Sequence, residues 1–77
     1  MNVNIERVIE IIREELCVDD DVEINGDTKL RQELEMDSLD TMGLISALED
    51  EYNINEELNY TNLVTVNDIV DVIKQYA

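Results

Sequence analysis

The sequence predicts an all-α protein: a small four-helix bundle with three main helices, one short helix and a long first loop. Three segments repeat apolar residues at the spacing of one helix face, and each has a residue near its start that can cap a helix. No pair of strand-like runs is present to form a sheet. The 77 residues contain no proline and no low-complexity linker, so we expect one domain, residues 1–77.

The first main helix is expected from Ile5 to Leu16. Asn2 or Asn4 can accept hydrogen bonds from free N–H groups at its start. Glu6 in the first turn suits the positive end of the helix dipole. Its apolar face is predicted to contain Ile5, Val8, Ile9, Ile12 and Leu16.

A long loop is expected from Val18 to Met36, because clustered aspartates and the Asn-Gly-Asp run at 25–27 oppose a regular element. Leu30 and Leu34 have the spacing of a short helical turn. A loop this long in a small domain is usually functional. Four apolar residues are expected to anchor it: Val22, Ile24, Leu30 and Leu34.

The second main helix is expected to start after Asp37 and continue to about Tyr52. Asp37 is expected to cap this helix, with Asp40 as a variant capping-box partner, because a carboxylate near the first turn satisfies free backbone N–H groups. Gly43 is anomalous, because glycine inside a helix costs about 1 kcal/mol relative to alanine. The predicted apolar stripe contains Leu44, Ile45, Leu48 and Tyr52.

A short helix is expected at residues 56–62, with Leu58 or Tyr60 facing inward. The last helix is expected to start at Thr65, with Asp68 as its capping partner. Its valines and isoleucines would also suit a strand, but the helical spacing and the cap favour a helix. The predicted apolar face contains Val66, Ile69, Val70 and Ile73, with Tyr76 at its edge.

Charge and residue content exclude several classes of function. The net charge of −15 argues against binding to nucleic acid or to an anionic membrane and favours basic partners. The absence of histidine excludes a Ser-His-Asp hydrolase and a zinc site of histidine and cysteine. Cys17 cannot form an internal disulfide, which suits a reducing compartment. No secretory signal or membrane-spanning run is visible, so we expect a soluble, cytoplasmic protein. We also expect it to be a monomer.

A group of residues around Ser38 stands at a distinctive spacing: Asp37, Ser38, Leu39, Asp40, Thr41, Leu44, Ala47, Leu48 and Glu49, preceded by Leu30 and Leu34 and followed by Val64, Thr65 and Val66. By these residues, and by length, helix order and charge, the sequence resembles an acyl carrier protein over essentially the whole chain.

The resemblance implies that Ser38 carries a covalent 4'-phosphopantetheine, transferred from coenzyme A by a phosphopantetheinyl transferase (holo-carrier synthase). The thiol of this arm, and not Cys17, would carry acyl groups as thioesters in fatty-acid or related polyketide or specialised biosynthesis. The chain would then be no enzyme but a substrate and cofactor for other enzymes. No catalytic residue or metal site is expected in it.

The resemblance also implies two further sets of site residues. Acyltransferases and synthases with basic patches would dock on the second helix, at Asp37, Asp40, Met42, Ala47, Glu49 and Asp50. An apolar pocket for the acyl chain has as its candidates Leu48, Tyr52, Ile54, Leu63 and Ile69, which as bundle residues also suit a plain core.

Three residues depart from the family pattern. Gly43 stands where glutamate is usual, Ser46 where a larger apolar residue is common, and Glu35 where glycine often precedes the Asp-Ser pair. The turn after the second helix lacks the customary proline. These departures concern the choice of partner more than the modification, and they are compatible with a specialised carrier.

Three alternatives remain. A peptidyl or aminoacyl carrier would share the serine and its helix. An acidic interaction module without a cofactor would explain the charge alone. A calcium-binding loop of EF-hand type is suggested by Asp21, Glu23, Asn25 and Gly26, but its twelfth position is Gln32 and not a glutamate.

Overall fold

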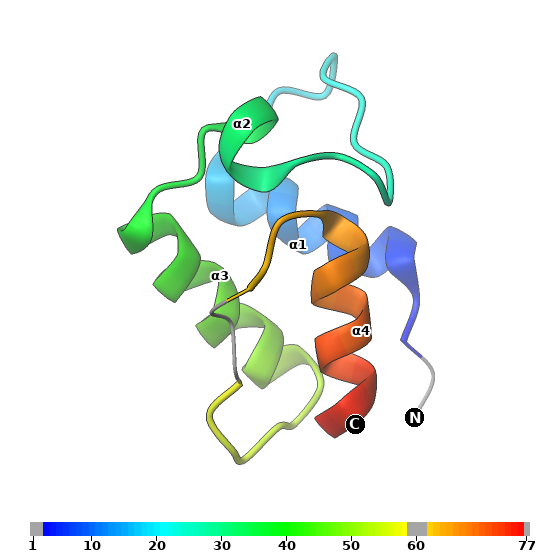
Figure 1. Ribbon diagram of the computed structural model, residues 1–77, viewed down its shortest axis with the longest axis vertical. Helices are drawn as coiled ribbons and strands as arrows, with labels where there is room; N and C mark the ends of the chain where they lie inside the picture. Colours follow the sequence, from blue (N-terminus) through cyan, green and yellow to red (C-terminus); the bar gives the residue numbers. More distant parts are fainter. Residues whose placement is uncertain (1–2, 59–61, 77) are drawn as a thin grey trace.

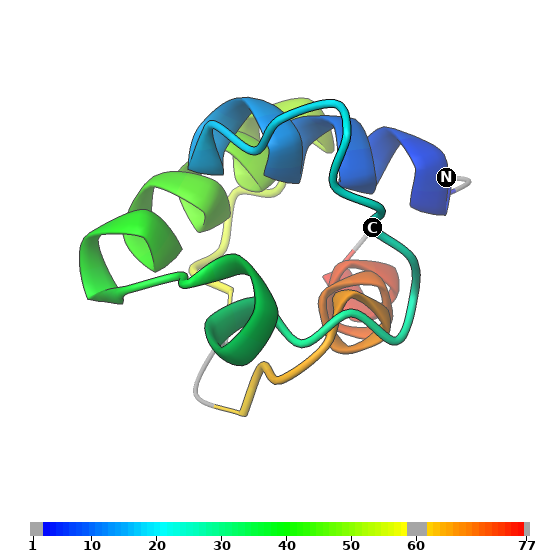
Figure 2. The same cartoon turned by 90° about the horizontal axis from the view of Figure 1, so that it is seen from above.

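The computed structural model describes residues 3–58 and 62–76, and within these ranges it contains four helices and no strand. In chain order they are α1 (Ile5–Leu16), α2 (Leu30–Leu34), α3 (Ser38–Glu51) and α4 (Val66–Tyr76). Helix α1 packs against both α3 and α4 (Figure 1). The view from above shows α1 and α2 on opposite sides of the molecule, with α3 and α4 flanking them (Figure 2). The predicted all-α bundle is confirmed.

Helix α1 begins and ends as its sequence predicts. The Asn4 side chain accepts the backbone N–H of Glu6 at 2.8 Å, so Asn4 is the cap. The helix ends at Cys17, an exposed residue in the left-handed conformation with φ of 53°. Ile11 is also buried, which the sequence analysis did not predict.

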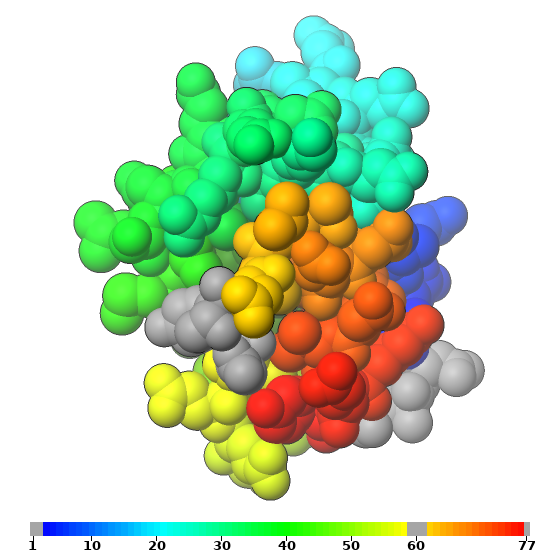
Figure 3. Space-filling view, in the orientation of Figure 1, coloured from blue at the N-terminus to red at the C-terminus, as the bar shows by residue number. Residues whose placement is uncertain are grey.

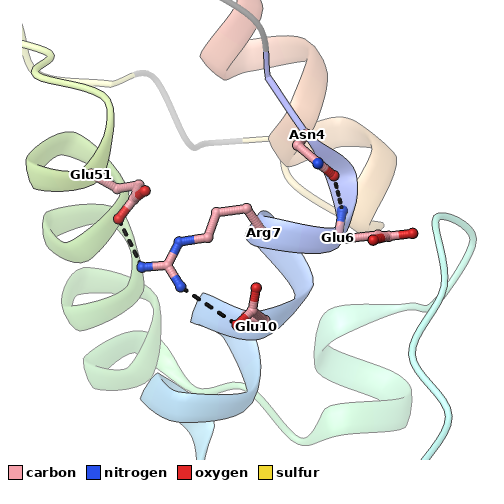
Figure 4. A network of polar contacts seen from close by, with 5 residues as sticks. All are labelled: Asn4, Glu6, Arg7, Glu10 and Glu51. Carbon is pink, nitrogen blue, oxygen red and sulfur yellow. Dashed lines mark hydrogen bonds and ion pairs between the residues drawn. The ribbon is translucent and has the colours of Figure 1, made fainter.

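An ion pair joins α1 to the end of α3 (Figure 4). Arg7 donates from Nη2 to Oε1 of Glu51 at 2.8 Å, and its Nη1 lies 3.7 Å from Glu10. The hydrogen bond lowers the pKa of Glu51 and raises that of Arg7. Both side chains are substantially exposed, so the pair orients the two helices more than it stabilises them.

The long loop is anchored at several points, by buried side chains and by hydrogen bonds to the segment that precedes and begins α4. Ile24 and Leu30 are buried, but Val22 is 41% exposed, so its predicted anchoring role is wrong. Val22 lies in a bend and is not among the residues that form the core or pack against it. Leu30 donates its N–H to the carbonyl of Val64 at 2.9 Å, and an isolated antiparallel bridge pairs Lys29 with Thr65.

Among the described residues the short helix is α2, and the predicted one at residues 56–62 is not seen in the part of it that the structure describes. Leu30 is fully buried and holds the five-residue turn against the core. Residues 56–58 are not helical; Leu58 is buried as predicted, and its N–H is bound instead by Oε2 of Glu49 at 3.2 Å. Residues 59–61, and with them Tyr60, lie outside the described residues.

Helix α4 confirms the predicted cap at Thr65 and Asp68. Asp68 Oδ2 accepts the N–H groups of Val64 and Thr65, each at 2.9 Å, and Thr65 Oγ1 accepts the N–H of Asp68 at 3.3 Å. These backbone hydrogen bonds lower the pKa of the Asp68 carboxyl.

The core is mainly aliphatic and lies between α1, α3 and α4. None of the described helices combines the length and the apolar character needed to cross a membrane. The buried hydrophobic residues are Val8, Ile11, Ile12, Ile24, Leu30, Met36, Leu44, Ile45, Leu48, Tyr52, Leu58, Val66, Ile69, Val70 and Ile73.

Candidate functional site at the start of helix α3

Ser38 is the first residue of α3, and local chemistry explains why the helix begins there. Asp37 has an extended backbone, and its Oδ1 accepts the N–H of Asp40 at 2.8 Å. Asp40 Oδ2 accepts the N–H of Asp37 at 3.2 Å, so the predicted capping box is confirmed. Thr41 is buried and donates from Oγ1 to the carbonyl of Asp37 at 2.8 Å. The helix start is thereby held at both ends of its first turn.

The Ser38 hydroxyl is exposed, and in the part of the chain that the structure describes it makes no hydrogen bond. The backbone N–H groups of Ser38 and Leu39 also have no acceptor among these residues. These two donors lie at the positive end of a helix of 14 residues, which is favourable for a phosphate. The residues present therefore fit a phosphodiester on Ser38 Oγ, although the carboxylates of Asp37 and Asp40 oppose its negative charge.

Two large apolar side chains project from α3 beside Ser38. Leu39 is 78% exposed and Met42 is 60% exposed. The sequence analysis placed Met42 on the docking face but did not include Leu39. Its position off the buried stripe of α3, directly after the serine, was the available signal. An exposed apolar pair of this kind beside Ser38 favours protein docking.

The other residues of the predicted docking face differ in exposure. Asp37 and Asp50 are exposed, whereas Asp40 and Ala47 are partly buried. Glu49 binds the backbone of Leu58 and lines a shallow hollow of about 150 Å³, whose other lining residues are Met42, Ile45, Ser46 and Glu57. Asp40 and Glu49 therefore have structural roles in addition to any role in docking.

The five predicted pocket residues lie at different depths in the structure. Leu48, Tyr52 and Ile69 are buried in the core, and Ile54 and Leu63 pack against it from outside. Ile54 lines a surface hollow near Tyr76, and Leu63 lines a different one near Lys29.

The described residues do not bring calcium ligands together, as the EF-hand alternative would require. The described residues contain no group of three or more acidic, histidine or cysteine side chains placed to hold a metal. In the suggested loop the side-chain oxygen of Asn25 accepts the N–H of Asp27 at 2.9 Å, and Gln32 lies inside α2.

The comparison with known families agrees with this geometry. The family model described as the phosphopantetheine attachment site matches residues 6–73. Several relatives carry the name acyl carrier protein. Acyl carrier protein 1, chloroplastic, of Casuarina glauca is 36% identical over 72 residues, which is 92% of this chain and 52% of the relative. Acyl carrier protein 3, chloroplastic, of Cuphea lanceolata is 39% identical over 70 residues, 90% of this chain and 48% of the relative. The acyl carrier protein of Rickettsia canadensis is 37% identical over 71 residues, 91% of this chain and 81% of the relative.

The chain belongs to the acyl carrier proteins, the carrier domains that bear a phosphopantetheine attachment site. Acyl carrier proteins are carriers and not enzymes, and their cofactor is phosphopantetheine. The chain spans about half the length of the chloroplastic relatives. The predicted family, cofactor and non-enzymatic role are confirmed, and the docking and pocket residues stay predictions.

Proposed function

We propose that this chain carries acyl groups as thioesters on a 4'-phosphopantetheine arm attached to Ser38, in fatty-acid or a related biosynthetic pathway. The observation that carries the proposal is the exposed Ser38 hydroxyl at the capped start of α3, in a chain of the phosphopantetheine attachment family. The relatives are named acyl carriers, which favours this reading over a peptidyl or aminoacyl carrier.

Attachment requires little chemistry from the chain itself. Ser38 Oγ forms a bond to the phosphorus that bears the pantetheine in coenzyme A, and adenosine 3',5'-bisphosphate leaves. The serine proton passes to a base of the transferase, which is consistent with a chain that contains no histidine. This chain contributes an accessible hydroxyl, a rigid helix start and two backbone donors toward the phosphate.

The test is incubation with coenzyme A, magnesium and a phosphopantetheinyl transferase, followed by intact mass measurement. We expect a gain of one phosphopantetheine mass in the natural chain and none in Ser38→Ala. The Ala variant should keep its helical circular dichroism, because the Ser38 side chain makes no described contact. Labelling of the Ala variant would refute the assignment.

The exposed surface of α3 suits partners with basic and apolar patches. Leu39 and Met42 supply apolar area, and the net charge of −15 accelerates association with cationic surfaces. Asp40 and Glu49 are poor test positions, because both accept backbone N–H groups. Asp50 is exposed and its side chain makes no described contact, so it reports on docking without disturbing the fold.

The docking test compares Asp50→Lys with Asp71→Lys. Asp71 is exposed on α4, so the two variants change the net charge equally but on different faces. We expect Asp50→Lys to slow the transferase reaction several-fold through association, with a weaker salt dependence, and Asp71→Lys to have a clearly smaller effect. Equal slowing by both variants would show that only net charge matters and would contradict a docking face on α3.

A further inference from the structure

A small hollow lies between α2 and the segment that leads into α4. It measures about 160 Å³ and is lined by Lys29, Arg31, Gln32, Leu63 and Val64. Figure 3 shows α2 and the segment before α4 on the same face of the molecule, with the start of α3 at the edge of that face. Val64 is 54% exposed and Leu63 is partly buried against the core. The hollow thus has an apolar wall and a polar, cationic edge.

The charge of this edge is unusual for the chain. Only five residues are basic against 20 acidic ones, and two of the five line this hollow. In residues 3–58 and 62–76 the ion pairs are made by Arg7, so Lys29 and Arg31 have no carboxylate partner there. The nearby carboxylates of Glu33 and Asp68 accept backbone N–H groups, and neither lines the hollow.

The two walls of the hollow are fixed to each other. The N–H of Leu30 binds the carbonyl of Val64 at 2.9 Å, and the bridge between Lys29 and Thr65 continues this connection. The site is therefore preformed, which reduces the ordering cost of binding.

Size and position restrict the occupant. Pockets for drug-sized ligands measure about 300–1,000 Å³, so this hollow suits only a short group. The chain from Gln32 to Ser38 spans at most about 17 Å, from two helical steps and four extended ones. A phosphopantetheine arm has roughly fourteen bonds between the serine oxygen and the sulfur, or about 16 Å at the spacing of an extended backbone. An acyl group on the arm can therefore reach the hollow.

We propose that this hollow binds the far end of a short dicarboxylic acyl group carried on Ser38. The methylene groups of the chain would contact Leu63 and Val64, and the terminal carboxylate would pair with Lys29 and Arg31, with the Gln32 amide as a further donor. The proposal rests on the proposed carrier function and assigns it a cargo class, an acyl chain with a second, free carboxylate.

The test uses the chain loaded with two acyl groups of equal length, glutaryl and pentanoyl, through a transferase and the corresponding acyl coenzyme A. Amide chemical shifts of Arg31, Gln32 and Val64 report on the hollow. We expect shifts in the glutaryl form that are absent from the pentanoyl form and that decrease in 0.5 M salt. An exposed ion pair changes an equilibrium constant by at most about fivefold. The double variant Lys29→Gln/Arg31→Gln removes two such pairs, so the ratio of bound to free glutaryl group should fall about three- to tenfold.

The control variant is Lys74→Gln, which removes an exposed positive charge from the last turn of α4. It should retain the glutaryl-specific shifts. Equal shifts with both acyl groups, or unchanged shifts in the double variant, would overturn the proposal. Intact mass, measured before each spectrum, separates the two hypotheses: failure to load contradicts attachment at Ser38, whereas full loading without glutaryl-specific shifts contradicts only the cargo site.

Discussion

The cap of α3 can be tested by substituting Asp37. The Asp37 side chain contributes in two ways: its Oδ1 accepts the N–H of Asp40 at 2.8 Å, and its charge lies at the positive end of the helix. Two substitutions distinguish these contributions. Asp37→Ala removes both, whereas Asp37→Asn keeps an acceptor oxygen and removes only the charge. Loss of an N-cap acceptor costs about 1 kcal/mol. Loss of the favourable charge adds about 0.3–1 kcal/mol.

The charge contribution is reduced in this chain, because each carboxylate also contributes to the repulsion within a net charge of −15. We therefore expect Asp37→Ala to lower the free energy of unfolding by about 1–1.5 kcal/mol and Asp37→Asn by only a few tenths. With a urea m-value of about 1 kcal/mol/M for so small a domain, the midpoint should fall by about 1 M in the Ala variant.

The measurement is urea unfolding of the three proteins, followed by circular dichroism at fixed ionic strength. Equal midpoints for Asp37→Ala and Asp37→Asn would show that the hydrogen bond to Asp40 contributes nothing. A midpoint for Asp37→Ala equal to that of the natural chain would refute the capping account of where α3 begins.

Three further substitutions test other features of the structure by thermal or urea unfolding. Glu35 ends α2 in the left-handed conformation with φ of 56°, so Glu35→Gly should stabilise the fold by about 0.5–1 kcal/mol; a loss of stability would contradict this strain. Gly43→Ala should stabilise α3 by about 1 kcal/mol, because the added Cβ meets only Glu15 Oε1 at 3.5 Å; destabilisation would reveal a contact that the structure lacks. The Tyr52 hydroxyl is buried without a described partner, so Tyr52→Phe should be neutral or stabilising by up to about 2 kcal/mol. Burial raises the pKa of Tyr52 above its usual value of 10.0, so the natural chain should lose stability above about pH 10 relative to Tyr52→Phe; parallel pH profiles would count against this.

Features that depend only on the local sequence could be predicted. The bounds of α1, α3 and α4 follow from apolar spacing together with caps at Asn4, Asp37 and Thr65, and a cap acts within one turn. The same reasoning placed Ser38 at the start of a helix. Its exposure follows from that position.

Features that depend on tertiary contacts could not be predicted. Ile11 is buried because α1 contacts two helices, α3 and α4, so its apolar face is wider than a single stripe. The pairing of residues 29–30 with 64–65 joins segments far apart in the chain, so no local sequence pattern predicts it. The hollow beside Lys29 lies between the two segments that this pairing joins. The structure also gives a physical reason for the glycine that often stands in the family where this chain has Glu35. The backbone at this position is left-handed, a conformation that glycine adopts without cost.

The most direct test of the central claim is fragmentation mass spectrometry of the Ser38 peptide after reaction with coenzyme A and a phosphopantetheinyl transferase. The account predicts that the added phosphopantetheine lies on Ser38 and on no other residue of the chain. A modification on another residue, or an unmodified Ser38 peptide under conditions that fully convert a known acyl carrier protein, would contradict it.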